Sequence, residues 1–366
     1  MWRGSSSAVA HKGRPGYKAP PATIRVLTLT GPTLVGPTLV TGATGFVGSA
    51  VARALARRGH ALRLLVRRGS DRRNIAGLDA ETMEGDLTDP ASLVRAVAGC
   101  RFLVHVAADY RIWVPDPLAM LAANVEGTRA LMRAALAAGL ERVVYCSSVA
   151  ALGLTGDATP ADEQTPVTRS KIVGTYKQSK FDAERSVIEL VDTARLPAVI
   201  VNPAAPVGPR DIKPTPTGRM IADAAAGRMP AYVDTGLNIV HVDDVAEGHV
   251  LALERGTIGQ RYILGGDNLT MAQLLALVDD VTGRRQRRVR LPVGALWPVA
   301  LAAEALARIG GTEPRVARDH LRMARKTMFF SSAKATEELG YHARPARQAI
   351  ADAVAWFREH GQVPPR

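Results

Sequence analysis

The segment TGATGFVG at residues 41–48 constrains this chain more than any other stretch of its 366 residues. It follows the strand-like run 38–41 and opens an apolar helical pattern over 46–58 that stops at Gly59. Glycines between a strand and a helix allow a tight turn, and they let the backbone approach a pyrophosphate whose charge is stabilised at the helix N-terminus. The segment therefore predicts a dinucleotide site. Its expected contacts are Gly42, Thr44, Gly45, Phe46, Val47 and Gly48.

Short β-branched runs alternate with alanine-rich helical stretches from residue 38 onward. The expected strands are 38–41, 61–66, 81–85, 102–107, 142–146 and 196–201, and the expected helices are 46–58, 90–97, 118–138 and 176–193. This alternation predicts an α/β fold with a doubly wound parallel sheet of the Rossmann type. Strands that are apolar throughout are typical of a sheet that helices cover on both faces.

The alternation loosens after Pro203, where prolines and glycines crowd residues 203–218. A helix is expected near 220–226, strands at 239–242 and 262–264 are expected to return to the sheet, and the chain from 270 to 360 is expected to be mostly helical. We therefore expect a Rossmann domain over 37–202 and 236–265. A smaller, mostly helical substrate-binding domain is expected over 203–235 and 266–360.

The pentapeptide GPTLV occurs twice in succession over residues 31–40, and only the second copy leads directly into the glycine turn. Proline is tolerated at the entrance of a buried strand but not inside it, so Pro37 is expected where the first strand begins. Residues 1–36 are therefore expected to form a flexible extension outside the sheet.

The formal net charge is +13, which raises the question of a nucleic-acid partner. Five basic residues and no acid lie in residues 1–36, five arginines lie in 284–290, and aromatic residues make up only 5% of the chain. No zinc-finger spacing or basic zipper accompanies them, so we expect a solvated basic surface and no nucleic-acid partner. No H-E-x-x-H pair occurs, and no metal is expected.

Two cysteines provide no disulfide framework, which is typical of the reducing cytoplasm. No segment has the length of uninterrupted apolar sequence that a membrane-spanning helix needs. The stretch 291–303, broken by Pro292 and Pro298, has two interpretations: a packed helix, or shallow docking on the inner face of the membrane beside the neighbouring arginines.

Arg67 and Arg68 follow the second expected strand, 22 positions after Gly45 in the case of Arg67. An acid at this place would hold a ribose 2′-hydroxyl, whereas arginine accommodates a 2′-phosphate. The first acid is Asp71. The sequence therefore favours NADP(H) over NAD(H).

Tyr176 and Lys180 are four residues apart at the start of an expected helix, so they share one face. Tyrosine is a poor acid–base near neutral pH, and the ammonium of Lys180 together with a nicotinamide ring is expected to lower its pKa. Such a tyrosine passes a proton to or from a carbinol oxygen while the nicotinamide exchanges hydride. Ser148 ends the run 143–148 at the carboxyl edge of the sheet, where ligands gather, and its hydroxyl is expected to hold the reacting oxygen.

These residues, in this order, resemble the extended short-chain dehydrogenase/reductase (NAD-dependent epimerase/dehydratase) family. The motifs that carry the resemblance are TGATGFVG, GDLTD at 85–89, HVAA at 105–108, NVEGT at 124–128, YKQSK at 176–180, NPAAPVGP at 202–209 and VHVDDVA at 240–246. Strings such as HVAADYRIW, GPRDIKPTPTGRMI and ARKTMFFSSAKATEELGY are similar to hopanoid-associated sugar epimerases, which are themselves similar to dihydroflavonol 4-reductases.

The resemblance implies catalysis by Ser148, Tyr176 and Lys180 and a role in hopanoid-related metabolism. It also implies that the family's frequent homodimer, paired through helices beside the sheet, applies here. The remaining cofactor contacts that it implies, besides Tyr176 and Lys180, are Asp86 and Leu87 on the adenine side, Ala107, Ala108, Asn124, Asn202, Pro203 and Ala204.

The reaction itself stays open between a sugar epimerase and an NADPH-dependent ketone reductase. A sugar dehydratase is disfavoured because Ser148 is followed by Val149 and Ala150 rather than by an acid pair. Arg67 favours a dissociable NADPH reductase, and a non-catalytic sensor or scaffold is disfavoured by the presence of Tyr176 and Lys180. The small-molecule substrate is expected to contact Tyr110, Arg111, Trp113, Arg210, Lys213 and Arg219.

Overall fold

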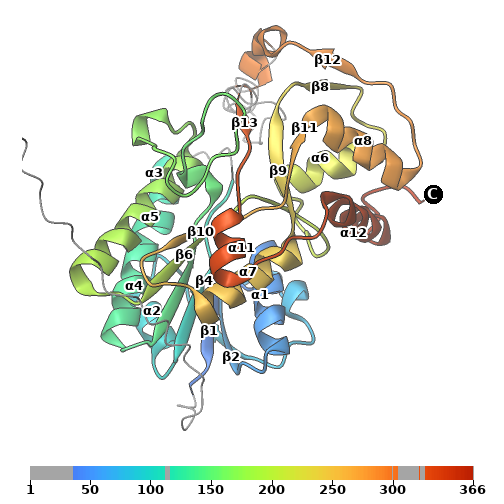
Figure 1. Ribbon diagram of the computed structural model, residues 1–366. Coiled ribbons are helices and arrows are strands. Elements are labelled where there is room, and N and C mark those ends of the chain that lie inside the picture. Colours follow the sequence, from blue (N-terminus) through green and yellow to red (C-terminus); the bar gives the residue numbers. More distant parts are fainter. Residues whose placement is uncertain (1–35, 112–115, 299, 304–320, 322–325, 366) are drawn as a thin grey trace, which may run out of the picture. The chain divides into compact units, whose positions relative to one another are not determined.

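The computed structural model describes residues 36–111, 116–298, 300–303, 321 and 326–365 (Figure 1). These residues belong to one compact unit, Val35–Arg366. The expected extension 1–36 and the predicted substrate residue Trp113 therefore lie outside the described residues, apart from Gly36.

A parallel sheet of seven strands forms the larger part of this unit, with the strand order β10-β6-β5-β4-β1-β2-β3. The order reverses direction between β1 and β4, and ligands of open α/β sheets bind outside the carboxyl ends of the strands at such a switch point. The predicted Rossmann sheet is confirmed. Its strands are β1 (Thr38–Thr41), β2 (Leu62–Val66), β3 (Glu81–Glu84), β4 (Phe102–His105), β5 (Arg142–Cys146), β6 (Ala198–Pro203) and β10 (Arg261–Leu264).

Helices cover both faces of this sheet (Figure 1). On one face α1 (Phe46–Arg57) packs beside α7 (Val242–Arg255), and on the other lie α2 (Pro90–Val97), α4 (Gly127–Ala137) and α5 (Thr175–Ala194). Successive strand residues point to opposite faces, so Val40 belongs to the first hydrophobic core and Leu39 to the second. This double burial explains why the strands are apolar throughout.

The expected helix over 118–138 is present, but it changes its winding in the middle. It consists of α3 (Pro117–Leu121), a π-helical turn η2 (Ala122–Glu126) and then α4. A π-helical turn inserts an extra residue into the winding and is often found at functional sites. Here the turn contains Asn124, one of the predicted site residues.

A second sheet organises the C-terminal half of the chain. In it β9 (Gly236–His241) pairs with β7 (Ala205–Val207), β11 (Asp267–Thr270) and β13 (Thr327–Met328). The helices α6 (Pro216–Ala225), α8 (Met271–Thr282) and α12 (Ala346–Glu359) share a hydrophobic core with it. The remaining elements are α11 (Ala333–Leu339), the short pair β8 (Ala231–Val233) with β12 (Val289–Leu291), and several 3-10 turns.

The expectation that residues 239–242 return to the main sheet is wrong. They form part of β9 in the second sheet, and Val242 already begins α7. The main-sheet edge beside β6 is taken instead by β10, which the sequence placed correctly at 262–264. The predicted boundaries between the two domains stay a prediction.

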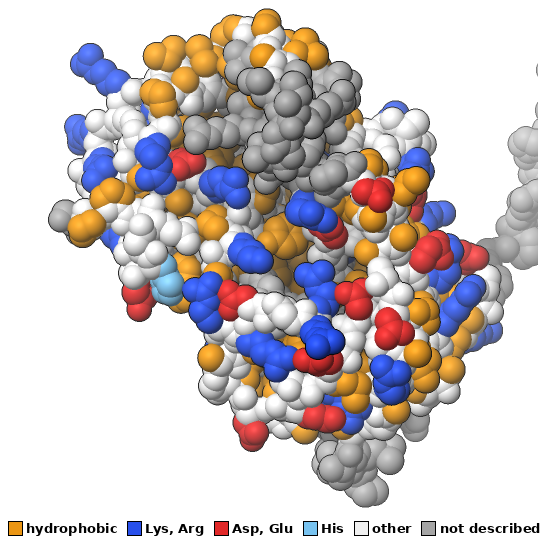
Figure 2. Space-filling view, turned by 180° about the vertical axis from the view of Figure 1, so that it is seen from behind, with side chains coloured by type: hydrophobic (Ala, Val, Ile, Leu, Met, Phe, Trp, Pro, Cys, Tyr) orange, Lys and Arg blue, Asp and Glu red, His pale blue; other side chains and the backbone are white. Residues whose placement is uncertain are grey.

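The basic residues do not form one continuous surface on the face drawn in Figure 2, where Lys and Arg side chains are interspersed with carboxylates. Of the arginines in 284–290, Arg288 pairs with Asp279 and Arg290 with Asp234. The stretch 291–303 continues from β12 into a 3-10 turn, Val293–Leu296, and helical residues follow. In the described ranges, no helix has the length and apolarity to cross a membrane.

Two glycines of the turn at 41–48 are required by close backbone contacts. Gly42 has φ +73°, and a Cβ atom there would lie 2.7 Å from the amide nitrogen of Ala107 at the end of β4. A Cβ atom at Gly48, on the first turn of α1, would lie 2.1 Å from the carbonyl oxygen of Gly42. The turn therefore folds tightly against both its own helix and the neighbouring strand end.

We predict that Gly48→Ala destabilises the fold and opens the turn, because the clash involves backbone atoms that cannot rotate away. The free energy of unfolding should fall by about 1–3 kcal/mol, and the affinity for the predicted dinucleotide should fall by about tenfold or more. Urea denaturation and calorimetric titration measure the two effects. Gly294→Ala is the matched control, since nothing lies within 4 Å of a Cβ atom there. A Gly48→Ala protein with native affinity would contradict the argument.

Candidate active site at the carboxyl edge of the sheet

The predicted catalytic residues meet where β4, β5 and β6 end. Ser148 follows β5, and Tyr176 and Lys180 project from the first turns of α5. The Lys180 side chain is buried, its ammonium donates a hydrogen bond to the carbonyl oxygen of Cys146 at 2.6 Å, and it lies 4.9 Å from the ring centre of Tyr145. The helix and the strand end are thus joined directly beneath the site.

The pKa of the Tyr176 phenol differs from what the sequence led us to expect. Burial raises its pKa to about 12, and a side-chain hydrogen bond with Ser148 opposes that rise. The lowering that was expected from Lys180 together with a nicotinamide ring does not offset this rise in the protein alone. Tyr176 therefore carries its proton at neutral pH, held beside the Ser148 hydroxyl.

A buried polar network supports Ser148 from behind. The amide of Asn202 donates to the Ser148 carbonyl oxygen at 3.1 Å and to Glu184 Oε2 at 2.7 Å, and Arg261 pairs with the other carboxylate oxygen of Glu184. Glu184 was missed by the sequence analysis, although it lies four residues after Lys180 and hence on the same face of α5. It positions Asn202, which in turn fixes the strand end that carries Ser148.

Asn124, in the π-helical turn, holds the segment after β4 against the catalytic helix. Its amide nitrogen donates to the carbonyl oxygen of Asp109 at 2.8 Å and to Ser179 Oγ at 2.9 Å, and its oxygen accepts from the Asp109 amide at 2.7 Å. These bonds use both of its N–H groups. The geometry gives Asn124 a positioning role beside the site.

The glycine turn and the start of α1 form a surface that fits an anion. Gly45 caps the helix without a side-chain hydrogen bond, and the first turn of α1 carries no acidic residue. The unpaired N–H groups and the helix dipole therefore favour a negative charge there. Phe46 is buried below, and the Thr44 carbonyl oxygen accepts from Asn74.

Arg67 and Arg68 are both exposed at the end of β2, and within the described residues neither forms an ion pair or a side-chain hydrogen bond. The nearby acid Asp71 is paired with Arg73 at 2.6 Å, and Arg72 is paired with Glu84. The charge of Arg67 is close enough to lower the pKa of Asp86, as does the hydrogen bond from Thr88. Arg67 and Asp86, a predicted adenine-side residue, therefore lie near each other, and the two exposed arginines carry positive charge without a carboxylate partner among the described residues.

The other predicted cofactor residues border the same edge. Ala107 donates its amide hydrogen to Thr41 Oγ1, and Ala108 follows it in a half-buried segment. Leu87 packs on the second hydrophobic core, while Pro203 ends β6 and Ala204 continues the chain beside Leu264. Their contacts with a cofactor stay predictions.

The predicted substrate residues do not all gather at one place. Tyr110 lies near Tyr176 and near Asp211, since it contributes to the raised pKa of the first and its own pKa is raised by the second. Arg219 is close to Asp211 as well, since its charge lowers that carboxyl's pKa. Arg111 folds back to pair with Asp109.

Two further members of that set lie elsewhere. Arg210 pairs with Asp243 and lines a different pocket together with Arg53. Lys213 is exposed near Asp71. Of the described substrate candidates, Tyr110 is thus placed beside Tyr176, and Arg219 beside Asp211.

Asp211, which the sequence analysis overlooked, is the buried carboxyl of this cluster. It is 2% exposed and accepts hydrogen bonds from the amide and hydroxyl of Thr215. A Cβ atom at Gly218 would lie 2.0 Å from its carboxylate oxygen, so glycine there leaves room for it. Burial raises the pKa of Asp211 to about 6.

A family model described as the NAD dependent epimerase/dehydratase family matches residues 38–265. The chain belongs to this family. The match covers the glycine turn, the arginine pair, the predicted catalytic residues and all seven strands of the main sheet. The resemblance to extended short-chain dehydrogenases is therefore confirmed, and the protein is an enzyme of the epimerase and reductase type that uses a nicotinamide dinucleotide.

Solved and named relatives agree with this placement. The chain is 63% identical to the protein in the crystal structure of gox2253, with a TM-score of 0.81, and the match covers 90% of this chain and 99% of that one. A Synechocystis sp. protein provisionally named a dihydroflavonol 4-reductase is 43% identical over 88% of this chain and 95% of its own length. Sterol demethylase protein B of Methylococcus capsulatus is 37% identical over 89% of this chain and 99% of its own.

We predict a pH-dependent stability effect from Asp211. Its folded pKa, about 6, lies above the unfolded value near 4, so the folded state binds the proton more tightly. The free energy of unfolding therefore loses about 2 kcal/mol as the pH rises from about 4 to 7, and Asp211→Asn should lack this loss. Denaturation of both proteins across this range measures the difference, with the exposed Asp79→Asn as control. Parallel curves for the Asp211→Asn and native proteins would contradict the assignment.

Proposed function

We propose that this enzyme is an NADP(H)-dependent oxidoreductase that interconverts a carbinol and a ketone, acting as a reductase of a bulky hydrophobic ketone. The observation that carries the proposal is the protonated Tyr176 phenol, held beside the Ser148 hydroxyl one helical turn before the Lys180 ammonium. A phenol that keeps its proton is prepared to donate it, which is what reduction of a carbonyl requires.

The chain's own residues perform the proton chemistry. Ser148 donates a hydrogen bond to the carbonyl oxygen and orients it toward Tyr176. When bound, a nicotinamide would supply the hydride that the carbonyl carbon receives. Tyr176 gives its proton to the oxygen, and the positive charge of Lys180 on the same helix face stabilises the phenolate that is left. The Glu184–Asn202 bond keeps the Ser148 strand end in place throughout.

Two relatives support a reductase of a large apolar molecule. One is provisionally named a dihydroflavonol 4-reductase, and the other is named for sterol demethylation. Neither name belongs to a sugar-modifying enzyme. A polycyclic ketone is therefore the substrate class that we favour.

The second candidate is a sugar epimerase of hopanoid-related metabolism. It is favoured by the family description, which includes epimerases, and by motifs such as GPRDIKPTPTGRMI. An epimerase must retain its dinucleotide through oxidation and re-reduction, whereas a reductase releases it. Mass spectrometry of the freshly purified protein separates the two, because a retained dinucleotide favours the epimerase.

We predict that Tyr176→Phe lowers kcat by about 10²–10⁴-fold, since it removes only the proton donor. NADPH affinity should be nearly unchanged. The assay follows NADPH oxidation with a panel of bulky polycyclic ketones, and Tyr232→Phe on β8 is the control. Full turnover by Tyr176→Phe, or a native protein inactive on every ketone, would overturn the reductase proposal.

We also predict that the double substitution Arg67→Ser and Arg68→Ser weakens NADPH binding by about 10–100-fold and leaves NADH binding nearly unchanged, because only NADPH carries the 2′-phosphate that guanidinium groups bind. Fluorescence titration of both cofactors measures the ratio. Arg72→Ser is the matched control, since Arg72 lies on the same loop but pairs with Glu84. An equal loss for both cofactors would reject the NADP assignment.

A further inference from the structure

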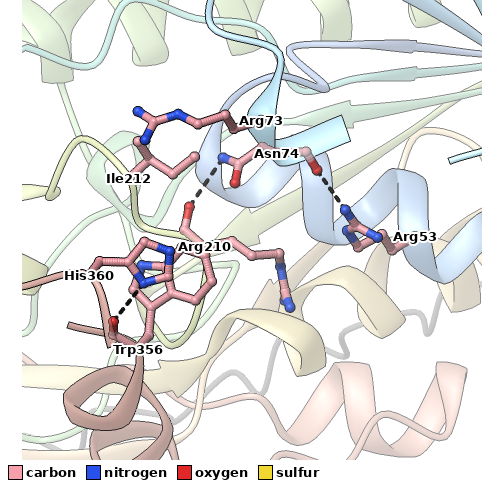
Figure 3. A pocket seen from close by; sticks show the side chains of 7 residues that line it. All are labelled: Arg53, Arg73, Asn74, Arg210, Ile212, Trp356 and His360. Carbon is pink, nitrogen blue, oxygen red and sulfur yellow. Dashed lines mark hydrogen bonds between the residues drawn. The ribbon is translucent and has the colours of Figure 1, made fainter. Parts of the chain in front are cut away.

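A cavity of about 400 Å³ lies on the flank of α1, and Tyr176 is not among the residues that line it (Figure 3). Four separate parts of the chain surround it: α1, the 3-10 turn η1 (Arg73–Ile75), the segment after β7, and the end of α12. Its volume falls within the range of small-molecule sites. The residues that line it are Arg53, Arg73, Asn74, Arg210, Ile212, Trp356 and His360.

Two of the guanidinium groups that line the cavity carry N–H donors for which the surrounding residues provide no acceptor. Arg53 uses one nitrogen, Nη2, to bond the carbonyl oxygens of Asn74 and Ala76, both at 3.0 Å, and its Nε is buried without a partner. Arg210 uses Nη2 for Asp243, and its Nε is also buried without a partner. A buried donor that lacks an acceptor costs free energy, so both groups are poised to gain from one.

The indole of Trp356 adds a third donor in the same wall. It stacks on the His360 ring with centroids 3.7 Å apart and planes inclined by 26°, and its Nε1 is buried without a partner. A hydrogen bond from His360 to the Trp356 carbonyl fixes the pair at the end of α12 (Figure 3). Tryptophan usually finds a partner for its N–H when it is buried.

The charge of the cavity is positive. Arg73 is neutralised by Asp71, and Asp243 pairs with Arg210, which leaves the charge of Arg53 without a carboxylate partner among the described residues. Burial lowers the pKa of the Arg210 guanidinium, and the nearby positive charges of Arg53 and Arg57 lower it further. Three unpaired N–H groups on residues that line the cavity, together with an excess cation, favour an oxyanion there once small side-chain rotations bring the donors to it.

We propose that this cavity binds the phosphate group of a small metabolite, independently of the cofactor. A phosphate presents several acceptor oxygens in different directions, so one group can take donors from both Arg53 and Arg210 after small rotations of their side chains, whereas a carboxylate has only two oxygens in one plane. The indole N–H then bonds either the phosphate or an adjacent polar group of the ligand.

Asn74 connects this phosphate site to the glycine turn. Its amide nitrogen donates to the carbonyl oxygen of Thr44 at 3.2 Å. The same nitrogen donates to the carbonyl oxygen of Arg210 at 3.1 Å (Figure 3). One side chain thus spans the wall between the cavity and the predicted pyrophosphate cradle. The two sites share a wall but use different donors.

The test is calorimetric titration of inorganic phosphate into the full-length protein saturated with NADPH, at ionic strength held constant with sodium chloride. We expect one phosphate to bind and to change tryptophan emission. Arg53→Gln should weaken it by about tenfold or more, and Trp356→Phe, which keeps the ring stack, by about fivefold. Arg72→Ser, an exposed arginine on the neighbouring loop, should bind phosphate normally.

Three results would overturn the proposal. If phosphate binds only when NADPH is absent, the binding site is the cofactor cleft and not this cavity. No binding to the saturated protein would remove the site, and equal binding by the native, Arg53→Gln and Trp356→Phe proteins would place it elsewhere. If Arg53→Gln does not fold, Trp356→Phe decides alone, because it removes a single N–H group without removing a charge.

Discussion

The backbone contact between Gly42 and Ala107 is the constraint on which the site depends. It brings the turn after β1 against the end of β4, at the point where the strand order of the sheet reverses. A side chain at Gly42 would separate the two strand ends. Because the glycines permit this approach, the uncapped N-terminus of α1 faces the same edge as the catalytic residues on α5.

The Tyr176 phenol bonds the Ser148 side chain, and the polar residues around this pair are held by bonds that anchor the backbone. Lys180 is fixed on the Cys146 carbonyl, and Asn202 is fixed between Ser148 and Glu184. This arrangement leaves the Tyr176 phenol protonated and free to serve the substrate. Asn124 likewise anchors backbone, because its amide group forms hydrogen bonds with the backbone of Asp109 in the segment after β4.

Much of the fold and of the candidate site could be predicted from the sequence. The strands of the Rossmann sheet, the helix opened by Phe46 and the meeting of Ser148 with Tyr176 follow from period, spacing and strand order, which are local properties. The return of 239–242 to the main sheet was predicted wrongly, because a strand pattern does not say which of two sheets provides its partner. The pKa of Tyr176 was misjudged for a related reason, since burial outweighs a neighbouring charge only in the assembled site.

The sequence by itself determined the fold class, the glycine turn and the arginine pair at the end of β2, because these depend on patterns of neighbouring residues; it also predicted Ser148, Tyr176 and Lys180 as catalytic from motifs. Only the tertiary structure decided that Asp211 is buried near Tyr110, and that Arg53, Arg210 and Trp356 surround one cavity. These residues lie far apart along the chain. Their positions depend on how α1, the segment after β7 and α12 pack, and no local pattern encodes that packing.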